Sequence, residues 1–455
     1  MDQPQQHFLV VSFPAQGHIN PSLQLGKRLA RLGAQVTFST ATEVHRRIPL
    51  GKLPPLLACS PYSVGKYDGY VDWVNIDWHD FLQELKSVGS RTLAELARDL
   101  AAAGRPVTCV VYNFLVPWAA AVARDLGVTS ALYWIQSAAV FAIYHLYFRG
   151  HPGLIKANRQ DPLSSVDLPG LPVLHVRDVP SLLFSRNPED DLFFPLVEEL
   201  FQTMDTKARV LINTFEALEL DYLQAAEPVE LLPIGPTLPS AYADGLDGTE
   251  TSFGGDLFEQ TPRESYTAWL DAQPNRSVVY VSFGSYTVLP VRQREEISRA
   301  LEDSQRSYLW VARGGREGVK ESSQGMVVEW CSQVEVLSHR AVGCFVTHCG
   351  WNSTLESLAC GVPIVGMPKW SDQPANAHLA EVAWGFGVRS EPSAEGLPDA
   401  AELRRCLDLV MGEGQRGEAV RQRAEIWGRR AREAVKEGGS SDRNLMGFVQ
   451  QRLTG

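Results

Sequence analysis

Short, uninterrupted apolar runs alternate with helical segments along most of the 455 residues, and this alternation constrains the fold more than any other feature. HFLVVSF (7–13) is followed by a turn-rich loop, PAQGHINP, by a helix at 22–33 and by a second apolar run at 34–40. The pattern recurs as a helix at 91–104, a strand at 107–112, a helix at 118–127 and a strand at 130–135. Strands buried on both faces are continuously apolar, and parallel strands need crossover helices. The sequence therefore predicts an α/β fold with a doubly wound parallel sheet.

A stretch rich in Gly, Pro, Ser and Thr at 233–261 interrupts the alternation, which then restarts. The second series has strands at 277–285, 307–313, 342–350 and 363–368, with helices at 290–304 and 353–361. A chain of this length exceeds what one hydrophobic core usually holds. We therefore expect an N-terminal domain over 1–238, a flexible linker over 239–261 and a C-terminal domain over 262–438. A final helix is expected over 439–455, where Leu445, Phe448 and Leu453 have a helical apolar spacing.

Charge and cysteine content restrict the partners. The chain has 42 Lys and Arg against 53 Asp and Glu, a net charge of −11, so its field repels polyanions and nucleic acid is not expected as a partner. No apolar run reaches the roughly 18 residues of a membrane helix, and the N-terminus lacks the basic segment of a secretory signal. The seven cysteines form no CxxC or CxxH pair, which predicts reduced thiols, no metal site and a cytoplasmic location.

Candidate site residues follow the predicted strands of both domains. In two-domain α/β proteins, ligands bind beyond the carboxyl ends of strands and in clefts between domains. His18, Asn113, Ser285 and His348 lie in or just before such loops, with His18 in the loop after the first strand. Neither domain contains GxGxxG or GxxxxGK[ST], so the usual dinucleotide and P-loop sites are not expected.

The segment THCGWNSTLES (347–357) has the pattern of a strand end, a turn and a helix start. Gly350 would permit the turn, and Asn352 or Ser353 would cap the helix, whose free N–H groups and dipole favour a phosphate. His348 could donate to the same anion, and Glu356 lies about one helical turn beyond Asn352. Taken alone, such a segment is more often an ordinary helix cap with a structural histidine and a solvated glutamate.

The wider segment from Trp330 to Gln373 contains every fixed position of WxxQxxVLxHxAxGxFxTHCGWNSxxExxxxGVPxxxxPxxxDQ. This pattern resembles the donor-binding signature of plant family 1 UDP-glycosyltransferases, and PAQGHINP, VSFGS and the two-domain layout extend the resemblance over nearly the whole chain. It implies a GT-B fold, in which two Rossmann-like domains face each other across a cleft. It also implies inverting transfer of a sugar from a UDP-sugar co-substrate to a small acceptor, without metal or other cofactor.

The resemblance implies a role for each donor-site residue. Trp330 would stack on uracil, with Cys331 and Gln333 beside the nucleoside, and Glu356 would bind the ribose hydroxyls. The diphosphate would contact Ser285, His348, Asn352 and Ser353. Trp351, Asp372 and Gln373 would face the sugar, and Gln at the last position resembles enzymes that use UDP-glucose. In this fold the C-terminal helix returns to the N-terminal domain, which holds the acceptor.

The resemblance also makes His18 the general base for the acceptor proton. The family normally pairs this histidine with an aspartate, but Asn113 occupies the corresponding position here. An amide cannot balance the charge of an imidazolium, and the corresponding Asp-to-Asn change in serine proteases costs roughly 10⁴ in rate.

Three explanations of Asn113 stay open: an easily ionised acceptor, help from another group, or a catalytically weak UDP-sugar-binding protein. The pKa of a phenol lies about three units above neutral pH, so its deprotonation costs roughly 4 kcal/mol, whereas a carboxylic acid is already ionised at neutral pH. We therefore favour a carboxylic acid or an acidic phenol or flavonoid. The segments at 115–128 and 130–138 also resemble the subgroup with glucose-ester formers and anthocyanin 5-O-glucosyltransferases, some of which depart from Asp here.

Aromatic residues near the strand ends of the first domain are candidates for the acceptor pocket, although core packing is the more common role of such residues. We expect the pocket to include Phe13, Phe114, Trp118, Trp134, Gln136, Phe141 and His145, with Trp370 from the second domain. His145 could serve as a second base. The protein is expected to act as a monomer.

Overall fold

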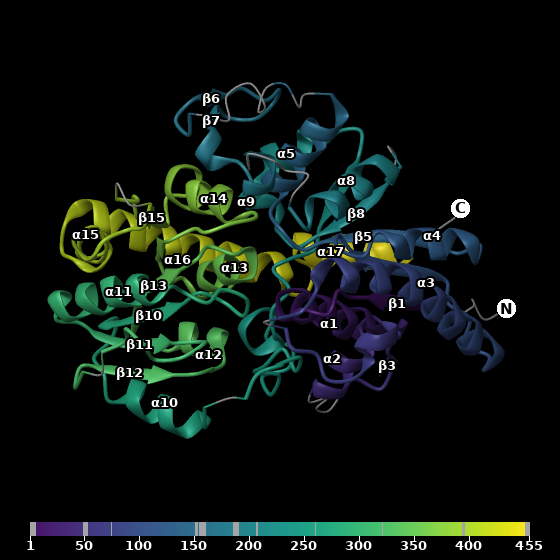
Figure 1. Cartoon of the computed structure of the whole chain (residues 1–455), viewed down its shortest axis with the longest axis horizontal. Coiled ribbons are helices and arrows are strands. Elements are labelled where there is room, and N and C mark those ends of the chain that lie inside the picture. The colour runs from purple at the N-terminus through teal and green to yellow at the C-terminus, as the bar shows by residue number, and fades with distance from the viewer. Residues whose placement is uncertain are drawn as a thin grey trace.

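The computed structural model describes residues 6–450 except 49–52, 74, 151–152, 154–160, 185–190, 206–207, 260, 321 and 394–395. It consists of two α/β lobes, each built on a parallel sheet, which lie side by side in Figure 1. The first lobe contains the strands up to Pro233, and the second contains those from Val278 onward. This is the GT-B architecture, so the predicted fold class is confirmed.

The sheet of the first lobe has seven parallel strands in the order β3-β2-β1-β4-β5-β8-β9. Their bounds are β1 His7–Val11, β2 Gln35–Ser39, β3 Leu57–Cys59, β4 Cys109–Asn113, β5 Thr129–Trp134, β8 Arg209–Ile212 and β9 Glu230–Pro233. Every residue of β1 and β4 is buried, as expected for strands covered by helices on both faces. A short antiparallel pair, β6 Ser165–Val166 and β7 Leu174–His175, lies outside this sheet.

Two helices of the first lobe begin earlier than the sequence suggested. Helix α1 starts at Gln16, which places His18 in its first turn and not in a loop, and leaves Pro21 inside the helix. Helix α3 starts at Trp78, where Asp77 caps it by accepting from the N–H of Asp80. The lobe's α-helices are α1 Gln16–Arg31, α2 Thr42–Arg47, α3 Trp78–Ala102, α4 Trp118–Asp125, α5 Ala138–Arg149, α7 Ser181–Phe184, α8 Phe194–Thr203 and α9 Glu216–Gln224.

The sheet of the second lobe has six parallel strands in the order β12-β11-β10-β13-β14-β15. They are β10 Val278–Ser282, β11 Ser307–Val311, β12 Gly325–Val328, β13 Val342–Thr347, β14 Ile364–Gly366 and β15 Gly387–Arg389. The surrounding helices are α10 Arg263–Asp271, α11 Val291–Ser304, α12 Gln333–Ser338, α13 Trp351–Cys360, α14 Gln373–His378, α15 Ala400–Met411 and α16 Gln415–Val435.

The segment between the lobes is held against α1 and is not a free linker. Glu250 accepts from Lys27 at 2.8 Å and pairs with Arg31, while Gln16 donates to the carbonyl of Gly255 at 2.9 Å. Composition suggested a flexible chain because the segment has no apolar period. Charge pairs and side chain–backbone hydrogen bonds join it to α1 instead.

The last helix, α17 Ser440–Gln450, crosses from the second lobe to the first, as the yellow ribbon in Figure 1 shows. Phe448 packs on Phe8 of β1 with ring centroids 5.7 Å apart, and the Ser441 hydroxyl donates to the carbonyl of Gly235 at 2.7 Å. Leu453 lies outside the described residues. A buried ion pair between Asp178 and Arg389, 2.5 Å apart, also joins the lobes.

The strand order reverses between β1 and β4 in one sheet and between β10 and β13 in the other. At such switch points the loops after adjacent strands turn apart and leave room for a ligand. All seven cysteines lie among the described residues and are free thiols. Within the described part of the chain, the helices are too short or too polar to cross a bilayer.

Candidate active site

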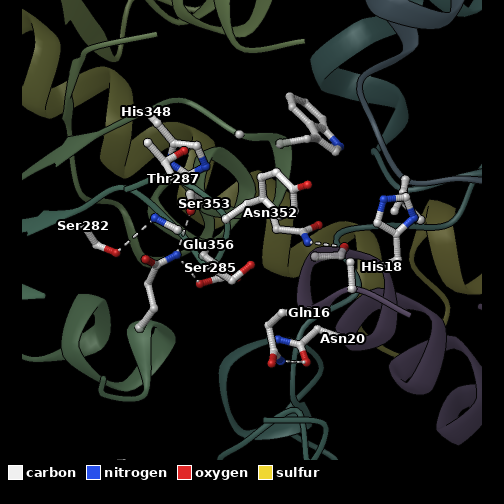
Figure 2. A pocket seen from close by; sticks show the side chains of 18 of the residues that line it. Gln16, His18, Asn20, Ser282, Ser285, Thr287, His348, Asn352, Ser353 and Glu356 are labelled. Atoms are coloured by element: carbon white, nitrogen blue, oxygen red, sulfur yellow. Dashed lines mark hydrogen bonds between the residues drawn. The ribbon is translucent and has the colours of Figure 1, made fainter. Parts of the chain in front are cut away.

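A cavity of about 250 Å³ lies between the two switch points. The structure brings most of the predicted site residues to its wall: Phe13, His18, Phe114, Gln136, Ser285, Trp330, Cys331, Gln333, His348, Trp351, Asn352, Ser353, Glu356, Trp370, Asp372 and Gln373. Figure 2 shows His348, Ser353 and Glu356 grouped on one side, His18 on the other and Asn352 between them. Residues from both lobes therefore line one shared cavity.

The turn from β13 into α13 differs from the predicted geometry. Helix α13 begins at Trp351 with Gly350 at the N-cap, so neither Asn352 nor Ser353 caps it. The positive φ of the turn, 64°, belongs to Cys349, whereas Gly350 has φ −59°. Gly350 is required for space, because a Cβ there would lie 2.6 Å from Nε2 of His348.

The ring of His348 lies between two glycines. A Cβ on Gly284, in the loop after β10, would also approach this ring to 2.8 Å. Burial lowers the pKa of His348 to about 4, so the imidazole is neutral near pH 7. A neutral ring can donate one hydrogen bond to an anion without adding charge, and α13, whose first-turn N–H groups lack partners within the helix, begins three residues later.

Glu356 belongs to a buried network and is not a solvated helix charge. It is 5% exposed, and its Oε2 accepts from Nε2 of Gln333 at 2.9 Å, while the same Nε2 donates to the Ser353 hydroxyl at 2.9 Å. Burial raises the pKa of Glu356 to about 8; Gln333 opposes this and the nearby charge of Asp256 adds to it. A protonated carboxyl can both donate to and accept from vicinal hydroxyls.

Trp330 lies at the same end of the cavity and packs against the inter-lobe segment. The ring centroids of Trp330 and Phe258 are 4.7 Å apart. The guanidinium of Arg313 lies over the ring of Phe258, 4.0 Å from its centroid. The indole Nε1 has no hydrogen-bond partner among the described residues. Phe258 thus supports the aromatic surface that a flat base would contact.

The residues expected at the sugar end are fixed by their own hydrogen bonds. Oε1 of Gln373 accepts from the N–H groups of Lys369 and Trp370 at 2.9 and 3.2 Å, so its NH₂ group is the part available to a ligand. Asp372 accepts from Asn376 at 2.7 Å, and burial raises its pKa to about 6. The indole of Trp351 donates to the carbonyl of Asn213 in the first lobe at 2.6 Å.

His18 lies between the rings of Phe13 and Phe114, with centroids 5.3 and 5.2 Å away. Burial lowers its pKa to about 4, which the neighbouring Asn113 amide only partly opposes. The ring keeps a face on the cavity. His18 is therefore a neutral imidazole at pH 7.

Asn113 lies behind His18 at the end of β4, outside the cavity wall. Its Oδ1 faces the N–H of Phe13 at 3.4 Å, and its Nδ2 donates to the Ser12 hydroxyl at 3.2 Å. Nδ1 of His18 is buried and has no hydrogen-bond partner among the described residues. The amide at 113 thus provides no countercharge to His18, and its polar interaction with the ring opposes the fall in the His18 pKa only in part.

Four aromatic residues expected in the acceptor pocket do not line the cavity: Trp118, Trp134, Phe141 and His145. They belong to the core of the first lobe. Trp134 is fully buried and donates to the carbonyl of Ser137, and the rings of Phe141 and His145 stack 6.1 Å apart. Aromatic residues at strand ends pack equally well inward, and sequence alone does not tell the direction.

The walls include other aromatic residues that the sequence did not single out. Phe193 and Tyr286 flank Trp370, with ring centroids 6.0 and 5.8 Å away, and Trp78 of α3 lies 6.0 Å from Tyr286. Phe253 and Asp256 of the inter-lobe segment also line the cavity. Trp78 lies behind Tyr286 and does not line the cavity. The four lining residues lie in irregular segments, where no period marks a residue as inward-facing.

Comparison with known proteins extends these observations. A family model described as UDP-glucoronosyl and UDP-glucosyl transferase matches residues 192–402. Phloretin 4'-O-glucosyltransferase of Malus domestica is 46% identical, and anthocyanidin 3-O-glucoside 5-O-glucosyltransferase of Verbena hybrida is 42% identical; each alignment covers 98% of both chains. The structure of Os79 from O. sativa in complex with UDP matches with a TM-score of 0.88 and 36% identity, covering 98% of this chain and 100% of the other.

The similarity extends over almost the full length, and the anthocyanidin enzyme represents the subgroup indicated by the sequence. The fold agrees over the same length. The chain is a glycosyltransferase and belongs to the family of UDP-glucuronosyl and UDP-glucosyl transferases.

Proposed function

We propose that the protein transfers glucose from UDP-glucose, with inversion, to an oxygen of a small lipophilic plant metabolite that ionises readily, a carboxylic acid or an acidic phenol. The observation that carries this proposal is the environment of His18. Its ring lines the cavity shared by both lobes, and its buried Nδ1 faces no carboxylate. Such an imidazole is a weak base, which suits an acceptor whose proton is already lost or easily removed.

The donor half of the proposal rests on the second lobe. Trp330 would stack on uracil, and Glu356 with Gln333 would bind the ribose. The α13 N-terminus, His348 and Ser285 would hold the diphosphate without a basic side chain. The NH₂ group of Gln373 and the carboxyl of Asp372 would bind the glucose hydroxyls.

The chemistry needs one bond to form as another breaks. The acceptor oxygen attacks the anomeric carbon while the bond to the diphosphate oxygen breaks, and UDP leaves. Any acceptor proton passes to the imidazole of His18. A phenol of pKa about 10 requires roughly 4 kcal/mol for this deprotonation at pH 7, whereas a carboxylate requires almost none.

The competing function is a UDP-sugar-binding protein with little catalysis, and the unpartnered Nδ1 of His18 favours it. Single-turnover assays with UDP-glucose separate the two. We expect wild type to glucosylate substituted benzoic acids and acidic phenols. We expect His18→Ala to lose transfer to phenols while keeping much of its activity on carboxylates. A preference for aliphatic alcohols, or UDP release that does not depend on acceptor, would contradict our proposal.

We further propose a monomer that works in the cytoplasm without a metal ion or nucleic acid. The net charge of −11 opposes binding of polyanions, and seven free thiols suit a reducing compartment. Size-exclusion chromatography, activity in the presence of EDTA and the location of a tagged chain in plant cells test these points. A stable dimer, loss of activity with EDTA or accumulation in an organelle would refute the corresponding point.

A further inference from the structure

The first turn of α1 contains a carbonyl that its own helix cannot satisfy. In an α-helix, each N–H donates to the carbonyl four residues earlier, so the partner of Gly17 would be the N–H of residue 21. Residue 21 is proline, which has no N–H and whose ring crowds that carbonyl. The carbonyl of Gly17, immediately before His18, therefore lacks the usual donor four residues further along the helix.

The other lobe supplies the missing donor. Nδ2 of Asn352, the second residue of α13, donates to the Gly17 carbonyl at 2.7 Å. Figure 2 shows Asn352 reaching across the cavity to the turn that carries His18. The hydrogen bond uses only the side chain of Asn352, so the backbone N–H groups of the first turn of α13 remain free for the proposed diphosphate. The side chain of Asn352 thus connects the lobes, while its backbone N–H belongs to the helix end that we propose binds the diphosphate.

The same turn is also tied to the inter-lobe segment. Nε2 of Gln16 donates to the carbonyl of Gly255 and to Oδ1 of Asn20, at 2.9 and 2.7 Å, and Oε1 of Gln16 accepts from the N–H of Leu257 at 2.7 Å. The turn around His18 is therefore held by the inter-lobe segment on one side and by Asn352 on the other. Only the hydrogen bond from Asn352 connects it to α13, which we propose binds the donor.

We propose that Pro21 and Asn352 are positioning residues: the proline leaves the Gly17 carbonyl free, and Asn352 uses that carbonyl to align His18 with the sugar donor. This inference rests on the proposed roles of His18 and of the α13 N-terminus. Neither side chain needs to touch the reacting atoms. Misplacing a base by about 1 Å can cost 10²-fold in rate, so a single aligning bond across the cleft has a measurable effect.

The test is Pro21→Ala, which supplies the missing N–H and lets the helix compete for the Gly17 carbonyl. Because alanine is a far better helix former than proline, we expect Tm to be unchanged or higher. We expect kcat on a weakly acidic phenol to fall about five- to tenfold, the effect of one neutral hydrogen bond, with less than a twofold change in KM for UDP-glucose. Pro195→Ala is the matched control, since Pro195 is exposed in the first turn of α8, where proline costs little.

A double-mutant cycle with Asn352→Ala completes the experiment. We expect the loss from Pro21→Ala to disappear in the Asn352→Ala background, because both changes remove the same contact. Independent losses in kcat, or a more stable Pro21→Ala enzyme with unchanged kcat, would overturn the inference while leaving the proposed function intact. If wild type transfers no glucose, the proposed function fails first, and titration with UDP then shows whether the donor site still binds.

Discussion

Replacing Asn113 by aspartate tests how the environment of His18 selects the acceptor. Asn113 is 1% exposed, and a lone carboxylate there would be costly to bury. Two donors are already in place: the N–H of Phe13, 3.4 Å from Oδ1, and the Ser12 hydroxyl, 3.2 Å from Nδ2, which can turn to donate. We therefore expect Asn113→Asp to fold with a somewhat lower Tm and with its carboxylate facing Nδ1 of His18.

The expected gain follows from the pKa of the imidazole. A carboxylate within 4–6 Å raises a histidine pKa by roughly 1–3 units, or about 1.4–4 kcal/mol. If about half of the proton has moved in the transition state, the barrier for a phenol falls by roughly 0.7–2 kcal/mol, which is about 3- to 30-fold in rate. A carboxylate acceptor has no proton to give, so its rate should change little.

The assay compares kcat/KM for a phenol of pKa near 10 and for a benzoic acid between pH 6 and 9, with Tm measured for each variant. Asn113→Ala serves as the control because it removes the amide without adding charge, and it should not raise the phenol rate. Equal gains on both acceptors, or a loss on phenols by a variant with normal Tm, would refute the link between Asn113 and acceptor acidity.

Three further predictions concern the rest of the cavity. Glu356 has a folded pKa of about 8, above the 4.5 of the unfolded chain, so its contribution to stability is complete below pH 4.5 and is lost as pH rises through 8. Glu356→Gln should therefore raise Tm relative to wild type at pH 8 more than at pH 5 while raising KM for UDP-glucose; identical Tm differences at both pH values would contradict the burial of this charge. Phe258→Leu should raise KM for UDP-glucose several-fold at constant kcat, because Trp330 loses its aromatic support, and an unchanged KM would show that the inter-lobe segment plays no part in donor binding. Tyr286→Ala should raise KM for aromatic acceptors but not for the donor, since Tyr286 packs on Trp370 at the acceptor side; a change in donor KM alone would place it elsewhere.

The two sheets could be predicted because their strands carry a local signal. A strand buried on both faces must be apolar along its length, as β1 and β10 are, and the helices between them complete the parallel connections. The cavity-lining residues from Trp330 to Gln373 were also predictable as a set. A strand end, a turn and a helix start bring most of them together within one stretch of chain.

The sequence by itself thus determined the fold, the family and most of the second-lobe residues that line the cavity. Tertiary structure alone decided which aromatic residues face the cavity, since Trp134 points into the core while Phe193 and Tyr286 reach the wall. It also decided the charge of His18 and the partner of Asn352, a carbonyl in the other lobe. Burial and hydrogen bonding at these positions depend on tertiary neighbours, which for Asn352 and Gly17 lie 335 residues apart in the chain, and a local period contains no information about them.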